Sequence, residues 1–333
     1  MRHKEEKTHY ELLEIPATAS GELIEEAYRK AKGLYSGDSM ALYSLYSQEE
    51  REEKLRQLDD IYETLMDPVK RKAYDEFIGG MVTSPPPSAE WSVEMASSKD
   101  IYDEYNEAGA FSDKLSLKQP LAVVESKEPM VAERYRILYT RLEQLSLKNS
   151  YKTIAITSAI KGEGKTTTAI NLAYLMATEF GKKVLLMEND LRCPAISSGY
   201  LNMGRLNGLI DVINGDADLR SAINRLDDTN LYFLPARASA KNSSVLLDSQ
   251  SMRSVLDNVK AHFDYIIIDA PPILPLVDMN ILSRMVDGLL LVVRAGSTPK
   301  DLVKKAVGAL PLKNLVGVVL NGADDVHMKK YYY

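Results

Sequence analysis

Apolar residues follow two different patterns along the chain, and the change between them divides it. From about residue 119 to 326, short runs of valine, isoleucine and leucine alternate with longer amphipathic segments. The short runs show no polar alternation, which is typical of strands buried on both faces of a sheet. The strands predicted in this way are Thr153–Thr157, Val184–Met187, Leu231–Leu234, Tyr265–Ile268, Leu289–Val293 and Val316–Leu320. The helices predicted between them are Thr166–Phe180, Ser251–His262, Asp278–Met285 and Lys300–Leu310.

This alternation of strands and helices predicts an α/β fold. Strands that are separated by helices pair in parallel, so we expect a doubly wound, mostly parallel sheet with helices on both faces. Such sheets bind ligands beyond the carboxyl ends of their strands. The loops that follow the strands are therefore where functional residues are expected.

Residues 8–78 have a helical period instead and are dense in charge. We predict a small all-α domain here, with helices His9–Ile15, Glu22–Tyr35, Glu49–Met66 and Val69–Phe77. Residues 79–118 contain Gly79-Gly80, three consecutive prolines and a stretch rich in serine and acids, which is too poor in apolar residues to form a core. We predict a flexible linker there, between the helical domain and the domain at 119–326.

Charge and cysteine content narrow the possible partners and compartment. The net charge of -6 argues against a nucleic-acid-binding function. The single cysteine excludes an internal disulfide and indicates a reducing compartment. Neither a secretory signal nor an apolar run long enough to span a membrane is evident, so we expect a cytoplasmic protein.

A phosphate-binding loop follows the first predicted strand of the α/β domain. Between a strand and a helix, glycines allow backbone N–H groups to surround phosphate oxygens at the positive end of the helix dipole. We expect Lys165 to reach the β- and γ-phosphates of ATP and Thr166 to bind Mg²⁺. The residues predicted to bind the nucleotide here are Lys161, Gly162, Glu163, Gly164, Lys165, Thr166 and Thr167.

Two further strands end in acidic residues, as a phosphoryl-transfer site requires. Glu188 and Asp190 are candidates for metal ligand and catalytic base, and Asp269 for a metal-side residue. Arg192 and Arg294 also follow strands and could neutralise phosphate charge. The alternatives are acids that cap helices and arginines held in structural ion pairs.

Together these motifs resemble the bacterial tyrosine kinases of polysaccharide export, P-loop ATPases related to the division-site and plasmid-partition ATPases of the MinD and ParA type. The resemblance covers about residues 121–333. It rests on Gly162–Thr167, Asp190–Pro194, Asp269–Pro272 and the terminal tyrosines. It implies that Lys165, Glu188, Asp190, Arg192 and Asp269 are catalytic, with Mg²⁺ held by Thr166, Asp190 and Asp269. Tyr331, Tyr332 and Tyr333, in a C-terminal tail over 327–333, are the implied phosphate acceptors, with Tyr102 and Tyr105 as the alternative.

The chain departs from that family at several positions. The family's second acidic motif opens with aspartate, whereas Glu188 extends the charge by one methylene, so restoring aspartate is expected to raise activity. The family's ring-forming helix reads Glu-x-x-Arg-x-x-Arg, whereas Glu133 and Arg136 are followed by Tyr139. Glu133 and Arg136 are the predicted oligomer contacts. Asn321, after the last strand, resembles the adenine-contacting asparagine of related ATPases.

The N-terminal helices resemble a J-domain. That family carries His-Pro-Asp after its second helix, where this chain has Ser36-Gly37-Asp38. Because only the aspartate is present, stimulation of a chaperone ATPase is not expected.

The resemblance predicts an ATP- and Mg²⁺-dependent protein-tyrosine autokinase that regulates polysaccharide synthesis and export. Its predicted partners are further copies of itself, in a ring or dimer, and the cytoplasmic segment of a membrane chain-length or co-polymerase protein, which would recruit it to the inner face of the membrane. The alternative is an ATP-switched assembly or positioning factor of the MinD and ParA type. An interaction protein with an inactive nucleotide site is the third possibility, against which the intact Lys165 and Thr166 argue.

Overall fold

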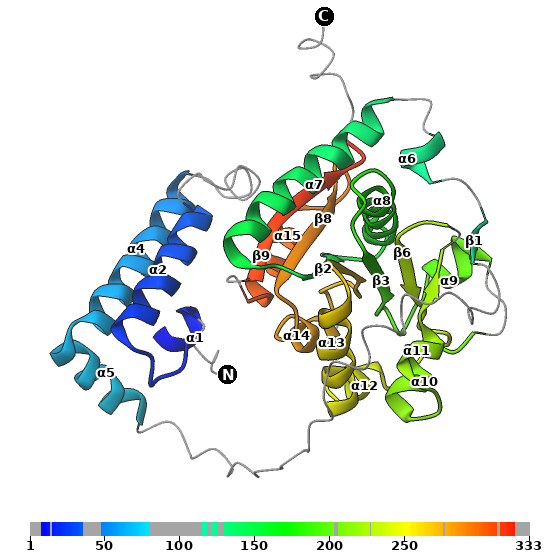
Figure 1. Ribbon diagram of the computed structural model, residues 1–333. Coiled ribbons are helices and arrows are strands. Elements are labelled where there is room, and N and C mark those ends of the chain that lie inside the picture. Colours follow the sequence, from blue (N-terminus) through cyan, green and yellow to red (C-terminus); the bar gives the residue numbers. More distant parts are fainter. Residues whose placement is uncertain are drawn as a thin grey trace, which may run out of the picture. The chain divides into compact units, whose positions relative to one another are not determined.

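The computed structural model divides the chain into two compact units, Met1–Ser112 and Asp113–Tyr333 (Figure 1). The residues that it describes are 8–13, 15–35, 48–79, 115–118, 121–125, 129–202, 206–226, 228–275, 277–311 and 314–323. Most of the predicted linker, the tripeptide Ser36-Gly37-Asp38 and the whole predicted tail lie outside the described residues.

The described elements of the first unit are helices, as the sequence pattern predicts. Its helices are α1 (His9–Leu13), α2 (Gly21–Tyr35), α4 (Gln48–Met66) and α5 (Pro68–Gly79). Helices α2 and α4 pack against each other through buried apolar side chains that include Ile24, Leu58 and Leu65. Asp67 caps α5 by accepting hydrogen bonds from the Val69 and Lys70 amides, at 2.8 and 3.1 Å.

Arg71 joins the end of this helical unit to its beginning. Its Nη2 donates to the carbonyl oxygens of Ala17 and Ala19, both at 2.9 Å, and its Nε donates to the Tyr10 hydroxyl at 3.0 Å. These bonds hold α5 against the turn between α1 and α2.

The second unit is built on a seven-stranded sheet in the order β5-β6-β3-β7-β2-β8-β9. All pairings in it are parallel except that of the short edge strand β5 with β6. Its strands are β2 (Thr153–Ser158), β3 (Val184–Glu188), β5 (Asn224–Arg225), β6 (Leu231–Leu234), β7 (Tyr265–Asp269), β8 (Gly288–Arg294) and β9 (Leu315–Asn321). A separate antiparallel pair joins β1 (Ser116–Leu117) to β4 (Leu201–Asn202).

Helices cover both faces of this sheet, which confirms the predicted doubly wound α/β fold. From β2 to β3 and β6 the chain moves along the sheet in one direction, and from β6 through β7 and β8 to β9 it moves in the other. Because both sets of crossovers are right-handed, α8 lies on one face of the sheet and α13, α14 and α15 lie on the opposite face. Helix α7 packs on α8. The helices of this unit are α6 (Ala122–Glu125), α7 (Pro129–Asn149), α8 (Lys165–Thr178), α9 (Ile196–Gly199), α10 (Leu209–Asn214), α11 (Leu219–Ala222), α12 (Ser243–Leu247), α13 (Gln250–His262), α14 (Asp278–Leu282) and α15 (Lys300–Ala309).

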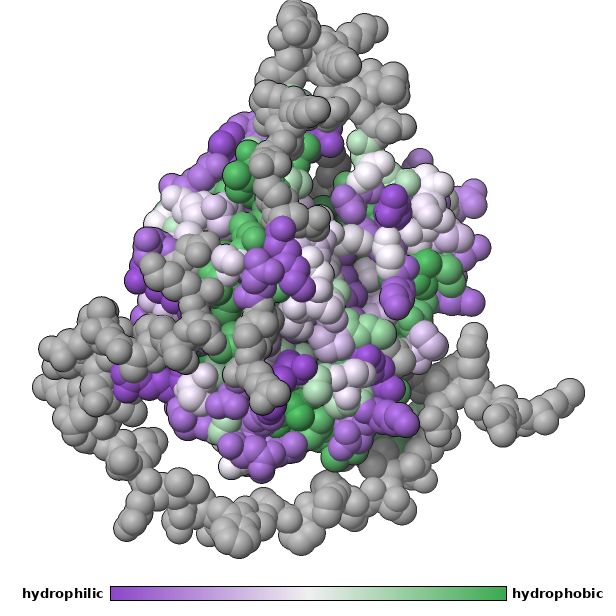
Figure 2. Space-filling model, turned by 90° about the vertical axis from the view of Figure 1, so that its right-hand side faces the viewer, coloured by the Kyte–Doolittle hydropathy of each residue, from purple (hydrophilic) through white to green (hydrophobic). Residues whose placement is uncertain are grey.

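The reversal of winding direction creates the functional edge of the sheet. The chain leaves β2 towards one face and leaves the neighbouring β7 towards the other, and such a switch point opens a crevice at the strands' carboxyl ends. Both strands are buried along their whole length, so the crevice has a rigid floor. Figure 2 shows hydrophilic and apolar residues interspersed on the described surface that faces the viewer.

Candidate functional site

The phosphate loop connects β2 to α8 and has the backbone shape that its glycines predict. Gly162 and Gly164 adopt φ angles of 91° and 94°, in the left-handed region that glycine enters without strain. A Cβ atom on Gly164 would lie 2.0 Å from Nδ2 of Asn321, so a side chain at this position would have to displace the Asn321 amide. Gly164 is also the N-cap of α8, which places the loop at the positive end of that helix.

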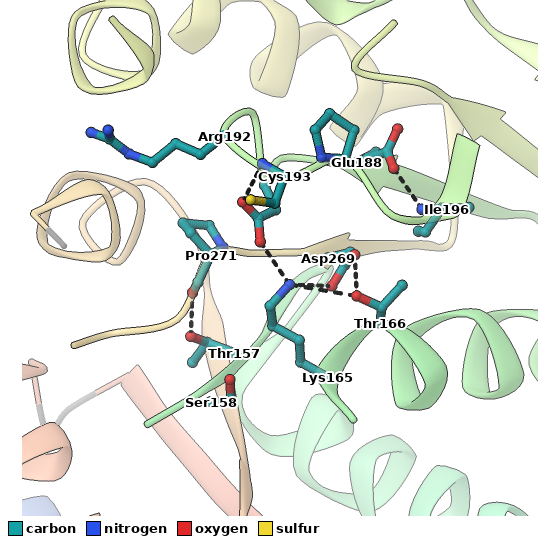
Figure 3. Close-up of polar contacts among 12 residues, drawn as sticks. Thr157, Ser158, Lys165, Thr166, Glu188, Arg192, Cys193, Ile196, Asp269 and Pro271 are labelled. Carbon is teal, nitrogen blue, oxygen red and sulfur yellow. Dashed lines mark hydrogen bonds and ion pairs between the residues drawn. The ribbon is translucent and has the colours of Figure 1, made fainter. Parts of the chain in front are cut away.

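Four predicted site residues meet at the end of this loop, and Figure 3 labels three of them, Lys165, Thr166 and Asp269. The ammonium of Lys165 lies 2.9 Å from Oδ2 of Asp190 and 3.5 Å from Oδ1 of Asp269. The Thr166 hydroxyl donates to the other oxygen of Asp269 at 2.8 Å. The side chains of Lys165, Asp190 and Asp269 are at most 8% exposed. Strands β2, β3 and β7 bring these residues together because their carboxyl ends lie side by side, with Ile156 paired to Asp269.

Burial and opposite charge compete at this cluster. Burial alone would lower the pKa of Lys165, but the charges of Asp269 and Asp190 outweigh it, so the pKa is raised. Desolvation raises the pKa of the wholly buried Asp269 to about 6, although Lys165 and Thr166 both lower it. Oδ1 of Asp269 has no hydrogen-bond partner among the described residues. The cluster therefore keeps a carboxylate in the protein interior with capacity for another ligand.

The outer side of the loop is attached to the ends of β8 and β9. The buried carboxylate of Glu163 accepts hydrogen bonds from the Ile160 amide at 2.7 Å and the Thr298 hydroxyl at 2.5 Å. Its backbone oxygen accepts from Nδ2 of Asn321 at 2.9 Å. Nη1 of Arg294 donates to the oxygen of Gly162 at 3.3 Å.

Three residues that the sequence predicted to bind the nucleotide have partners within the protein. Glu163, Arg294 and Asn321 all lie at the loop, but their observed partners are groups of the protein that hold the loop in shape. The hydrogen bond from Thr298 to Glu163 was not predicted, because nothing in the local sequence distinguishes this hydroxyl from that of any other loop threonine. Lys161 is exposed on the loop's surface.

Two predicted catalytic residues point away from the cluster. Figure 3 shows Arg192 directed away from Lys165 and Glu188 directed towards Ile196. Nε of Arg192 lies 2.9 Å from Oδ2 of Asp278, a buried acid whose pKa is lowered because its hydrogen bonds to Arg192 and neighbouring serines outweigh desolvation. Arg192 thus occupies the structural ion pair that the sequence offered as its alternative role.

The predicted oligomer contacts also have partners within the chain. Arg136 donates to Glu179 through Nε at 2.7 Å and Nη2 at 2.9 Å, and to Glu133 through Nη1 at 3.1 Å. Tyr139, at the third position of the family's ring-forming pattern, is 1% exposed and packs on Phe180 with ring centroids 4.0 Å apart. Its side chain belongs to the core and not to the surface.

The chemistry available at the crevice is that of oxygen ligands and one ammonium. Within the described ranges, no three histidine, cysteine or acidic side chains are grouped to hold a metal ion. Mg²⁺ in nucleotide sites needs fewer protein ligands, since one or two carboxylates or hydroxyls are joined by waters and phosphates. Thr166 and Asp269 fit that requirement. No helix in the described part of the chain is long and apolar enough to cross a membrane.

Comparisons with known proteins agree with this architecture in both units. Residues 151–298 match the family model described as an AAA domain, and residues 8–75 match that of the DnaJ domain. The kinase domain of the Escherichia coli tyrosine kinase ETK has a similar structure, with a TM-score of 0.57 at 26% identity, over 69% of this chain and 88% of that one. The J-domain resemblance is thus confirmed as a match over the N-terminal helices.

Curated relatives identify the family of the second unit. Tyrosine-protein kinase YwqD of Bacillus subtilis is 34% identical over 215 residues, which are 64% of this chain and 90% of that protein. The succinoglycan biosynthesis transport protein ExoP of Rhizobium meliloti is 33% identical over 214 residues, although this chain covers only 27% of its length. Because this identity extends over 90% of YwqD and agrees with the topology and the lysine–aspartate cluster of the P-loop unit, the chain belongs to the bacterial tyrosine-protein kinase family.

Proposed function

We propose that this kinase transfers the γ-phosphate of Mg-ATP to its own C-terminal tyrosines, Tyr331, Tyr332 and Tyr333. The observation that carries the proposal is the buried cluster of Lys165, Thr166, Asp190 and Asp269 directly beneath the phosphate loop. A buried acid with an oxygen that accepts no hydrogen bond, and has only the Lys165 ammonium at 3.5 Å, costs stability, and a protein that only needed a stable fold would gain from replacing it. A role in holding a charged ligand accounts for it.

The position of each residue indicates its role in the reaction. The loop amides and the N-terminus of α8 bind phosphate oxygens, and Lys165 turns its ammonium from Asp190 to the phosphates. The Thr166 hydroxyl and Asp269 would hold Mg²⁺ or its waters. When bound, Mg-ATP supplies the phosphoryl group and a positive charge that offsets negative charge developing during transfer.

The acceptor tyrosine needs help to lose its proton, because the ordinary pKa of tyrosine is about 10. Asp190 is the carboxylate best placed to assist, since it lies against Lys165 and becomes free when the ammonium turns to the phosphates. Glu188, the other predicted base, has no hydrogen bond or ion pair to Lys165 among the described residues, and its role is treated separately below.

The tail lies outside the described residues, and its role rests on its position in the sequence. Strand β9 ends at Asn321, which touches the phosphate loop, so the residues that follow begin beside the site. The lysines that precede the tyrosines would be attracted to the acids of a neighbouring copy. Each phosphate added would bring about two negative charges and repel the same acids.

We further propose that the protein works in the cytoplasm in polysaccharide synthesis, recruited to the membrane by the cytoplasmic segment of a co-polymerase protein. The match to a succinoglycan transport protein supports this assignment. The rival function, an ATP-switched assembly factor, would use the same loop without modifying tyrosine.

Replacing Tyr331, Tyr332 and Tyr333 by phenylalanine separates these functions. If the protein is a kinase, the triple variant should lose phosphate incorporation. Its copies should remain associated with one another in the presence of Mg-ATP, whereas copies of the wild type should dissociate. Undiminished tyrosine phosphorylation in the variant would place the acceptors elsewhere, with Tyr102 and Tyr105 the next candidates. Nucleotide-dependent association without any phosphotyrosine would favour the assembly factor.

A further inference from the structure

The carboxylate of Glu188 is fully occupied by groups outside the Lys165 cluster. Its Oε1 accepts hydrogen bonds from the amides of Ile196 at 2.7 Å and Ser197 at 3.1 Å. Its Oε2 accepts from the Ser197 hydroxyl at 2.6 Å and the Ala236 amide at 3.1 Å. The residue is 0% exposed. To accept a proton from tyrosine, Glu188 would first have to release these donors.

The segment that Glu188 holds leads back to the phosphate loop. Ile196 and Ser197 open the short helix α9, and the amide of Tyr200, just after it, donates to the oxygen of Ile196 at 2.9 Å. The hydroxyl of Tyr200 lies 2.9 Å from Oγ1 of Thr167, the last predicted residue of the phosphate loop. Hydrogen bonds, joined through the side chain of Tyr200, therefore connect the end of β3, through α9, to the first turn of α8.

We propose that Glu188 is a positioning residue, which fixes α9 so that the Tyr200 hydroxyl holds the Thr167 side chain in place for nucleotide binding. This inference rests on the kinase function proposed above and adds Tyr200 to the residues that serve it. Tyr200 is a positioning residue as well, because its observed partner is Thr167.

Side-chain length explains why glutamate stands at this position. An aspartate would withdraw the carboxylate by one carbon–carbon bond, about 1.5 Å. Hydrogen bonds of 2.6 to 3.1 Å to donors on both α9 and the segment after β6 would then exceed the usual limit unless the backbone moved. The family pattern has aspartate at this position. The extra methylene of glutamate allows one carboxylate to hold both segments.

A double-mutant cycle tests the path, with Mg-ADP affinity measured by calorimetry on the full chain. Tyr200→Phe removes only the hydroxyl, and loss of one such hydrogen bond should weaken binding by about two- to tenfold. Glu188→Asp should weaken it by at least as much. Because both changes interrupt the same path, the double variant should bind no more weakly than Glu188→Asp alone, within about a factor of two. Tyr232→Phe, in a half-buried tyrosine of β6 that packs on Phe263, is the matched control and should bind as the wild type does.

The opposite pattern would overturn the proposal. A catalytic base at position 188 predicts that Glu188→Asp binds Mg-ADP normally, changes kcat and its pH profile, and leaves Tyr200→Phe without effect. Additive losses in the double variant would also refute the path, since they would mean that the two residues act separately. If Glu188→Asp fails to fold, unchanged affinity in Tyr200→Phe alone is sufficient to reject the idea. These affinities are independent of tyrosine phosphorylation, so absence of kinase activity in the wild type would reject the function and leave this test valid.

Discussion

Asp269→Asn should make the nucleotide-free protein more stable at neutral pH while abolishing its Mg²⁺-dependent activity. Desolvation raises the pKa of Asp269 to about 6 from an ordinary 3.8. At about 1.36 kcal/mol per pH unit, that difference means that the charged carboxylate costs the folded state about 3 kcal/mol at pH 7. Asparagine resembles the neutral acid, so the variant should avoid up to this amount.

The sign of the pH dependence follows from which state holds the proton. Below pH 4 the acid is neutral in both states and contributes no difference. Between pH 4 and 6 the folded protein keeps a proton that the unfolded chain has lost, so stability falls as the pH rises. Above pH 6 the full cost applies. The stability of the variant relative to the wild type should therefore increase from near zero at pH 4 to its maximum by pH 7.

Scanning calorimetry of both full-length proteins from pH 4 to 8 measures this difference. Mg-ADP identifies the transition of the kinase unit in the wild type, because only that transition should shift upward on binding. A gain of about 3 kcal/mol corresponds to a rise in Tm of up to about 10 °C for a unit of this size. Parallel pH profiles for the two proteins would refute the electrostatic account of the cluster, as would a variant that is less stable at pH 7.

Three further perturbations test other parts of the site. Lys165→Met should abolish Mg-ATP binding. It should also cost about 3 to 5 kcal/mol of stability at pH 7, because it leaves Asp190 and Asp269 without their cation. Calorimetry measures both effects, and the control Arg253→Met, in the exposed ion pair with Asp248, should change neither. Gly164→Ala should weaken nucleotide binding far more than Gly162→Ala, because both glycines have positive φ but only at Gly164 would the added Cβ meet Asn321, 2.0 Å from its Nδ2. Equal losses would show that the contact is unimportant. Arg136→Ala should leave the Tm close to that of the wild type, because its ion pairs with Glu133 and Glu179 are exposed. If Arg136 also serves the predicted ring, the variant should have a lower mass in solution with Mg-ATP, and unchanged mass in light scattering would remove it from the interface.

The elements and the loop-borne motifs could be predicted because local information determines them. Runs such as that of β7 are apolar enough to require burial on both faces, and Gly162 and Gly164 enforce a loop shape that few other sequences adopt. The clustering of Lys165 and Asp269 follows from parallel topology alone, since it brings the carboxyl ends of adjacent strands together.

The directions of individual side chains could not be predicted in this way. Glu188 ends β3 and Arg192 lies in the loop after it, but donors distant in sequence, such as Ala236, and acceptors such as Asp278 decide where each one points. Arg136 of α7 similarly pairs with Glu179, the residue that caps the C-terminus of α8, after one intervening strand. Motif spacing places residues near the ends of strands but contains no information about such competing partners.

Tyrosine autophosphorylation is the central claim, and mass spectrometry of the purified protein after incubation with Mg-ATP tests it most directly. The measurement compares the wild type with Lys165→Met, each alone and with the cytoplasmic segment of a candidate membrane partner. The account predicts phosphate on Tyr331, Tyr332 and Tyr333 of the wild type, more of it when the segment is present, and none on Lys165→Met. A wild type that binds Mg-ATP yet carries no phosphotyrosine under either condition would contradict it.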